Sequence, residues 1–202
     1  DWLAVELTVN GWSMKKLHRL IVTSSTYRRQ SGIGGSDNPN LAVDPDNRFL
    51  WRMNRHRLEA EAVRDSLLLL SGQLDFRQGG PEIDNSLGQT SSRRSLYFSH
   101  HPEILMPFLE LFDVANPRCC YRRKTTVVPQ QALGLTNSGL ALNQSRLLAR
   151  KLWRVIAPES TSPTKREEAF VKEAFIHILS RTPTAMEQST CEDFLQQQAA
   201  FF

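Results

Sequence analysis

The chain has 202 residues, a length that suits one large domain or two small ones. Apolar residues make up 40% of the sequence and charged residues 23%, the balance of a globular protein with a substantial core. No apolar run approaches the roughly 20 residues that cross a bilayer, so we expect no membrane span. Both ends read as interrupted helices, so we expect a fragment of a larger protein, truncated at its N-terminus.

The formal net charge is +4, and arginine supplies 19 of the 25 basic residues. Arginine favours fixed, bidentate pairing with carboxylates, whereas lysine tends to stay solvated. The basic residues are spread along the chain and interleaved with acids, while a nucleic-acid binder more often gathers them into one stripe. The pattern therefore disfavours nucleic-acid binding, which is the weakest of three functional interpretations.

The three cysteines are Cys119, Cys120 and Cys191. An adjacent pair and a distant single residue fit neither a disulfide framework nor the spacing of a zinc site. The C-x-x-C-H attachment motif for haem c does not occur in the sequence. We therefore expect free or buried thiols and no cofactor in this chain.

Helical periodicity dominates the first third of the sequence. Residues 13–24 alternate an apolar and a basic face and predict an amphipathic helix that Ser13 caps. Residues 31–47 are rich in Gly, Asn, Asp and Pro and predict a loop. Because the loop ends in an Asp-Pro pair typical of a helix start, we predict one long helix over Pro45–Ser71, closed by Gly72.

The middle of the chain carries weaker signals. Residues 73–92 predict a loop, and the aromatic or β-branched stretches 93–99 and 124–128 predict two short strands that pair as a small sheet. Between them, residues 102–113 predict a helix that Pro107 shortens or kinks.

Beyond residue 128 the pattern is helical again. A helix over 129–156 begins at a proline, and the polar stretch 157–164 reads as a linker. Residues 165–202 predict a helical hairpin that packs on the main body, residues 1–156. The predicted fold class is therefore mainly α, a helical bundle around the long central helix with a small two-stranded β element.

The stretch 54–72 raises a functional question because seven charged or titratable side chains fall within twelve positions. On a helical wheel the surrounding residues form two apolar faces, which predicts a helix sandwiched between layers. One face holds Trp51, Leu58, Ala62 and Leu69, and the other holds Phe49, Met53, Ala60, Val63, Leu67 and Leu70.

Two polar seams separate these faces and contain favourable helical pairs. Arg55 with Glu59 and Arg57 with Glu61 stand at i,i+4, and Glu61 with Arg64 stands at i,i+3. Buried charges of this kind must be paired, because an unpaired charge in a core is costly. We interpret the seams first as an ion-pair network and second as the lining of a functional cleft.

The same region carries a family resemblance. The sequence resembles the planctomycete-type domain of unknown function 1553, in segments that follow the family's order and cover nearly the whole chain. These segments are GWSMKKLHRLIVTSSTYRRQS (11–31), DPDNRFLWRMNRHRLEAEAVRDSLLLLSGQLD (44–75), RRSLYFS (93–99), FDVANPRCCYRRKTTVVPQQALGLTNS (112–138) and ILSRTPTAMEQ (178–188).

The resemblance implies a setting but no reaction. Such domains typically end large exported proteins that also carry a planctomycete cytochrome c module, which implies a periplasmic or cell-envelope location. Haem c is then expected only in a neighbouring module, and the partners are other domains of the same polypeptide. Family-like positions in this chain include His18 and Arg123.

Metal ligands are only weakly indicated. The oxygen-rich loop with Asp37, Asp44 and Asp46 could hold a hard cation such as calcium, but it lacks the spacing of a known calcium loop. Turn and cap roles explain most of these residues. His100 and His101 are adjacent and would point apart, which disfavours one shared metal.

Two main hypotheses follow. The first is a non-catalytic structural and docking module, with Arg55, Arg57, Arg64, His18 and Arg123 in binding or ion-pair roles. The second is a subdomain of an enzyme that acts on an extracellular polymer such as a polysaccharide, with Glu59, Glu61 or Asp65 as general acid or base. A general acid needs a raised pKa, and several arginines nearby would lower it, which argues against that role.

Overall fold

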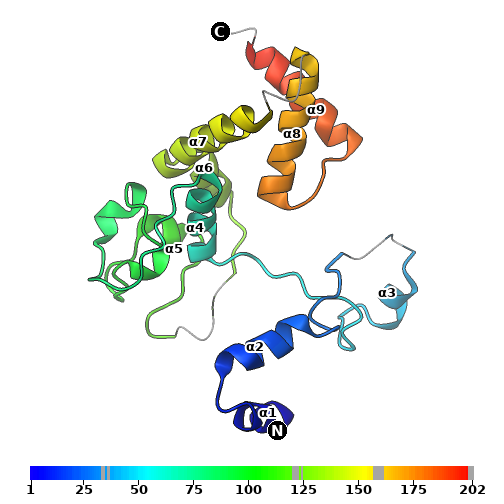
Figure 1. Ribbon diagram of the computed structural model, residues 1–202, viewed down its shortest axis with the longest axis vertical. Helices are drawn as coiled ribbons and strands as arrows, with labels where there is room; N and C mark the ends of the chain where they lie inside the picture. Colours follow the sequence, from blue (N-terminus) through cyan, green and yellow to red (C-terminus); the bar gives the residue numbers. More distant parts are fainter. Residues whose placement is uncertain (33–34, 36, 120–122, 124, 157–161, 200–202) are drawn as a thin grey trace. The chain divides into compact units, whose positions relative to one another are not determined.

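The structure is a computed structural model that describes residues 1–32, 35, 37–119, 123, 125–156 and 162–199. It divides into two compact units, unit 1 (Asp1–Arg57) and unit 2 (Leu58–Phe202). Over the described residues the chain is mainly helical, as predicted (Figure 1). No helix in that part of the chain combines the length and the apolar character needed to cross a bilayer.

The described residues of unit 1 form three helices. These are α1 (Trp2–Val9), α2 (Met14–Thr23) and the short α3 (Pro39–Val43). The predicted cap of α2 is confirmed, because the side chain of Ser13 accepts a hydrogen bond from the backbone N–H of Lys16. The predicted loop over 31–47 includes α3, which begins at a proline behind the capping side chain of Asn38.

The prediction of one long helix over Pro45–Ser71 is wrong, because α4 covers only Ala60–Ser71. The carboxylate of Asp44 accepts hydrogen bonds from the backbone N–H groups of Arg48 and Phe49, both at 2.8 Å, and so closes a turn. Left-handed backbone at Asn47 (φ 57°) and Leu50 (φ 55°) then ends any helical path. Arg55 and Arg57 lie before the start of α4, so the predicted helical i,i+4 geometry with Glu59 and Glu61 does not hold.

The buried side of α4 differs from both predicted faces. Its buried residues are Ala60, Arg64, Leu68 and Ser71, of which only Ala60 belongs to a predicted apolar face, whereas Leu69 on the other face is 51% exposed. Gly72 closes the helix in the left-handed region (φ 81°), as predicted. The helix is therefore central to unit 2 through its contacts with α5, α7 and η2, but other elements do not cover it on both sides.

The remaining elements of unit 2 are 3₁₀ turns and helices. They are η1 (Asn85–Gln89), η2 (Ser95–Tyr97), α5 (Pro107–Leu111), α6 (Pro129–Asn137), α7 (Gly139–Ile156), α8 (Pro163–Leu179) and α9 (Ala185–Ala199). Pro107 begins α5, which is short as predicted. The stretch predicted as one helix over 129–156 is two helices that meet at Ser138.

The predicted two-stranded sheet is wrong, because the described residues contain isolated bridges and no strand. Residues 93–99 instead hold the η2 turn and bridge to Asp75 and Ile83. The reason is that side chains of α4 form hydrogen bonds with backbone groups of this stretch, and those groups are then not free to pair with a neighbouring strand. Residues 125–128 belong to no strand and no helix.

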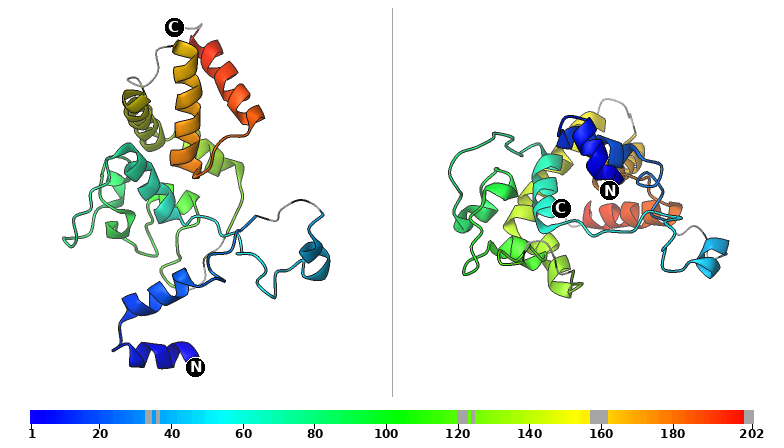
Figure 2. Two further views of the ribbon diagram at one scale, coloured as in Figure 1. Left: turned by 45° about the vertical axis from the view of Figure 1, so that its right-hand side comes forward. Right: turned by 90° about the horizontal axis from the view of Figure 1, so that it is seen from below.

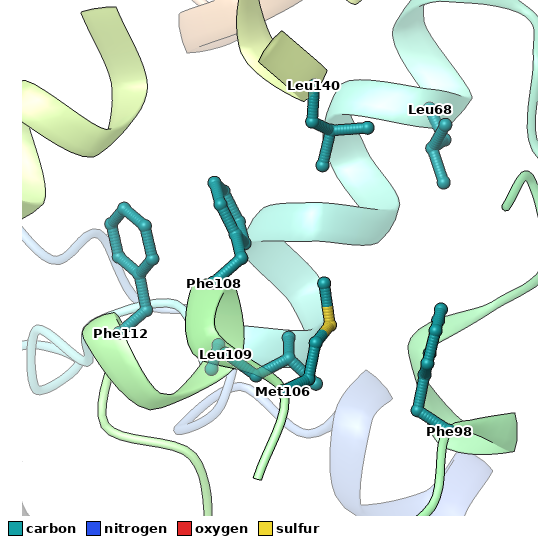
Figure 3. Packing of buried hydrophobic residues seen from close by; sticks show 8 residues of the cluster. Leu68, Phe98, Met106, Phe108, Leu109, Phe112 and Leu140 are labelled. Carbon is teal, nitrogen blue, oxygen red and sulfur yellow. The ribbon is translucent and has the colours of Figure 1, made fainter. Parts of the chain in front are cut away.

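Two hydrophobic clusters hold unit 2 together. The first packs α4 against α5, η2 and the start of α7, through Leu68, Phe98, Met106, Phe108, Leu109, Phe112 and Leu140 (Figure 3). The second joins α7 to α8, through Leu148, Leu152 and Ile156 with Phe170 and its neighbours. Figure 2 shows α8 and α9 side by side as a hairpin. The predicted linker lies largely outside the described residues.

Candidate functional site

The candidate carboxylates gather at one helix of unit 2. Glu61 and Asp65 lie on α4, and Glu59 is its N-cap residue. Arg123, from the segment between α5 and α6, reaches the same place. Arg55 and His18 belong to unit 1, where Nε of Arg55 donates to the carbonyl oxygen of Ser31 at 3.2 Å.

Arg64 is fully buried, with 0% of its surface exposed. Its three guanidinium nitrogens all donate hydrogen bonds. The acceptors are the carbonyl oxygens of Gly88 (3.1 Å), Ser91 (2.5 Å) and Arg93 (2.9 Å), with the hydroxyl of Ser95 at 3.4 Å. The side chain therefore organises the loop 88–95 from inside and is not available to a ligand.

The electrostatics of Arg64 follow from this burial. Loss of solvent lowers the pKa of its guanidinium, and the nearby charge of Asp65 partly opposes the change. The guanidinium also lies over the ring of Phe98, with 4.7 Å from Cζ to the ring centroid. A buried cation is tolerated here because carbonyl dipoles, a carboxylate and an aromatic face replace its water shell.

Asp65, the next residue of α4, binds the same loop as Arg64. Its Oδ1 accepts hydrogen bonds from the backbone N–H (2.7 Å) and the hydroxyl (2.6 Å) of Ser95. Its Oδ2 lies 3.6 Å from Nε of Arg94. Asp65 and Arg64 together fix the η2 turn against α4, which is a structural role.

Glu59 and Glu61 share one cation. Nη1 of Arg123 lies 2.7 Å from Oε2 of Glu61, and its Nε lies 3.4 Å from Oε1 of Glu59. The partners expected for both glutamates were arginines of the same helix. The partner instead comes from a segment about sixty residues further along the chain.

The three carboxylates nevertheless line an open cleft of about 530 Å³. Its wall also includes Arg94 and the apolar side chains of Leu69, Leu74, Phe76 and Leu96. A smaller hollow of about 220 Å³ shares Glu61 and Leu96 with it and extends to Ser99 and His100. The arrangement offers hydrogen-bond acceptors beside an apolar wall, which suits binding of a polar ligand with an apolar face.

Several residues of this cleft were not predicted as part of a site. Arg94 and Leu96 lie in a stretch that was predicted as a strand, and Leu74 and Phe76 lie in a predicted loop. The Arg-Arg-Ser string at 93–95 is a local signal for Arg94, because polar residues there do not fit a buried strand.

The weak metal candidates are explained by loop structure. Asp44 is buried, and both of its carboxylate oxygens accept hydrogen bonds from backbone N–H groups. Asp46 is exposed on the same turn, and Asp37 also has an interaction partner. Among the described residues, no group of three or more His, Cys, Asp or Glu side chains is placed to hold a metal ion.

The cysteines show no disulfide in the part of the chain that is described. Cys119 is exposed and Cys191 is half-buried, and both are free thiols. Cys120, for which a free or buried thiol was also expected, lies outside the described residues.

Comparison with known proteins identifies the family without supplying an activity. No curated protein and no solved structure matches this sequence. One family does match, over residues 1–195, nearly the whole length of the chain. The expected resemblance is therefore confirmed, and the chain belongs to the family described as protein of unknown function (DUF1553).

Proposed function

We propose that this chain is a non-catalytic structural and docking module of a larger exported protein that carries a cytochrome c module in the same polypeptide. The proposal places the protein in the periplasm or cell envelope and assigns haem c to the neighbouring module. Its support is the way the candidate catalytic groups are engaged by the fold.

The observation that carries the proposal is the state of Arg64 and Asp65. The guanidinium is fully buried and bound to carbonyl oxygens, and the carboxylate is bound to Ser95. A proton-transfer group needs access to substrate and a geometry within hydrogen-bond reach of it. Arg64 and Asp65 instead hold the backbone of residues 88–95 in place, which is a structural role.

The test is to detect the native polypeptide. An antibody against this chain, applied to fractionated cells of its source, should reveal an envelope or periplasmic band well above 23.0 kDa that retains covalent haem after denaturation. A band without haem, or one in the cytoplasmic fraction, would contradict the proposal. Mass spectrometry of the same band checks that it contains this sequence.

A second candidate function is the binding of an extracellular polysaccharide in the carboxylate-lined cleft. The observation in its favour is that Glu59, Glu61 and Asp65 face a cleft of about 530 Å³ whose wall includes the exposed ring of Phe76. Sugars present hydroxyl donors to carboxylates and an apolar face to aromatic rings, so both parts of the wall would be used.

Calorimetric titration with soluble neutral and amino-sugar polysaccharides tests this candidate. The double variant Glu59→Gln, Glu61→Gln should lose at least tenfold in affinity if the cleft binds them. A double variant of the same charge change on α8, Glu168→Gln with Glu173→Gln, is the matched control and should bind normally. Equal binding by both variants removes the cleft from consideration.

A further inference from the structure

The helix α7 carries an unusual charge pattern. Over Gly139–Ile156 it contains Arg146, Arg150, Lys151 and Arg154 and no aspartate or glutamate. The three arginines stand at i, i+4 and i+8, so they share one exposed side of the helix. Like charges at this spacing repel one another, so the pattern does not serve the stability of the helix.

An apolar groove of about 510 Å³ opens beside these arginines. Its floor consists of Ala149 and Trp153 from α7, Phe170 from α8, and Leu195 and Ala199 from α9. The rings of Trp153 and Phe170 meet edge to face, with 6.0 Å between centroids. Trp153 is still 44% exposed, so the groove presents an aromatic surface to any occupant.

The groove follows from how the three helices pack. Leu148, Leu152 and Ile156 turn one side of α7 toward α8, and Trp153 lies at the edge of this contact, where its ring meets Phe170 but stays 44% exposed. The hairpin of α8 and α9 lies beside α7 (Figures 1 and 2). Side chains of α8 and α9 line the other side of the groove. The groove is a product of the tertiary arrangement and not of any single helix.

Charge decides what would fit. Arg150 and Arg154 line the groove, and among the described residues of its wall Glu167 of α8 is the one acidic side chain. The ion pairs that are resolved in the described chain include neither arginine. An occupant of matching chemistry has apolar side chains for the floor and carboxylates for the guanidinium groups, which bind them in a bidentate manner.

We propose that the groove between α7, α8 and α9 is the docking site for an acidic amphipathic helix of a partner domain. Such a helix places apolar residues at i, i+3 or i+4, and i+7 into a groove and keeps its acids at the edge. A nucleic acid has phosphates for the arginines but no side chains for the floor, and a bilayer surface is too flat to enter the groove. The inference rests on the docking role proposed above and names its surface.

A synthetic peptide tests the inference directly. The probe is a labelled 16-residue helical peptide with Leu at the apolar positions and Glu elsewhere, and its partner probe has Lys in place of each Glu. Fluorescence anisotropy with the full chain should show saturable binding of the acidic peptide, weakened by added salt, and no binding of the basic one.

Two charge variants locate the site. Arg150→Glu with Arg154→Glu should lower the affinity for the acidic peptide at least tenfold and create binding of the basic peptide. Lys165→Glu with Lys172→Glu changes the net charge equally at exposed positions of α8 outside the groove wall, and should change affinity less than twofold. Circular dichroism checks that both variants keep the helical content of the parent chain.

Three results would overturn the inference. They are equal binding of both peptides, equal loss of affinity in both charge variants, or binding of duplex DNA or anionic vesicles, but not of the acidic peptide, that depends on Arg150 and Arg154. The outcome is separable from the proposed function, because a native haem-bearing polypeptide that binds no acidic peptide here would contradict the groove alone.

Discussion

Nη1 of Arg123 lies 2.7 Å from Oε2 of Glu61, a residue 62 positions earlier in the chain. Nε of the same guanidinium lies 3.4 Å from Glu59, so one side chain connects the first turn of α4 to the segment between α5 and α6. Both members of the closer pair are less than a third exposed, which limits screening by water and salt.

The first prediction concerns this pair. Because the two charges are partly buried and in contact, a double-mutant cycle of Glu61→Gln and Arg123→Gln should show a coupling energy of about 1 kcal/mol. Urea unfolding of the parent chain, the two single variants and the double variant measures it. Additive effects within about 0.3 kcal/mol would show that the contact contributes nothing to stability.

The second prediction concerns Arg64. Arg64→Met should lower the free energy of unfolding by about 3–5 kcal/mol, because it leaves several buried carbonyl oxygens without their hydrogen-bond donor and removes the cation beside Asp65. Arg64→Lys should recover only a small part, since an ammonium cannot reach the three separated carbonyl groups as the planar guanidinium does. Thermal and urea unfolding measure both, and a loss below about 1 kcal/mol for Arg64→Met would contradict the structural role.

The third prediction concerns the start of α9. Both guanidinium end nitrogens of Arg181 bind Glu187, at 2.6 and 2.8 Å, and the backbone N–H of Thr184 donates to the same carboxylate at 2.8 Å. The Arg181 hydrogen bonds are the main cause, and the Thr184 N–H the next, that lower the pKa of Glu187 from 4.5 to about 2. Thr184 and Glu187 also form a reciprocal capping box.

A depressed carboxyl pKa stabilises the folded chain above pH 4.5, and this contribution is lost as the pH falls from there toward 2. Carbon-detected NMR of the Glu187 carboxyl should therefore show a midpoint near pH 2. In Arg181→Gln the midpoint should move up toward 4.5, because the largest cause is removed. A midpoint near 4.5 in the unmodified chain would refute the pairing in solution.

The fourth prediction concerns the close packing of η1 on the core. A Cβ at Gly88 would lie 2.9 Å from Cγ of Met106, which is buried and has little room to move. Gly88→Ala should therefore destabilise unit 2 by about 1–3 kcal/mol through overpacking. Gly32→Ala, where a Cβ meets no atom within 4 Å, is the control and should stay within about 0.5 kcal/mol of the parent chain.

Local signals in the sequence predicted much of the helical structure. Ser13 as the cap of α2, Gly72 as the end of α4 and the shortening of the 102–113 helix by Pro107 are all confirmed. Each of these signals acts within one helical turn, through a side-chain hydrogen bond, a left-handed backbone or a missing N–H. Such effects depend on a few neighbouring residues, and the amino-acid order alone displays them.

Errors arose where hydrogen bonds of polar side chains outweigh the helix or strand preference of a stretch. The periodicity of 49–70 favours one helix, but Asp44 and Asn47 bind their own loop and stop it before Ala60. The stretch 93–99 has strand-like side chains, but Arg64 and Asp65 take up its backbone groups. Both outcomes depend on which polar groups are satisfied in the folded chain, and the helical wheel contains no information about that.

The sequence by itself therefore determined the helical class, the family, several helix starts and ends, and the presence of a charged cluster in need of partners. The tertiary structure decided which partners those charges take, where the carboxylate cleft opens and that α7, α8 and α9 enclose an apolar groove. The physical reason is the separation along the sequence of the residues that interact. Caps and turns depend on neighbours within a few residues, whereas the hydrogen bonds of Arg64 and the ion pairs of Arg123 join positions 24 to 64 residues apart.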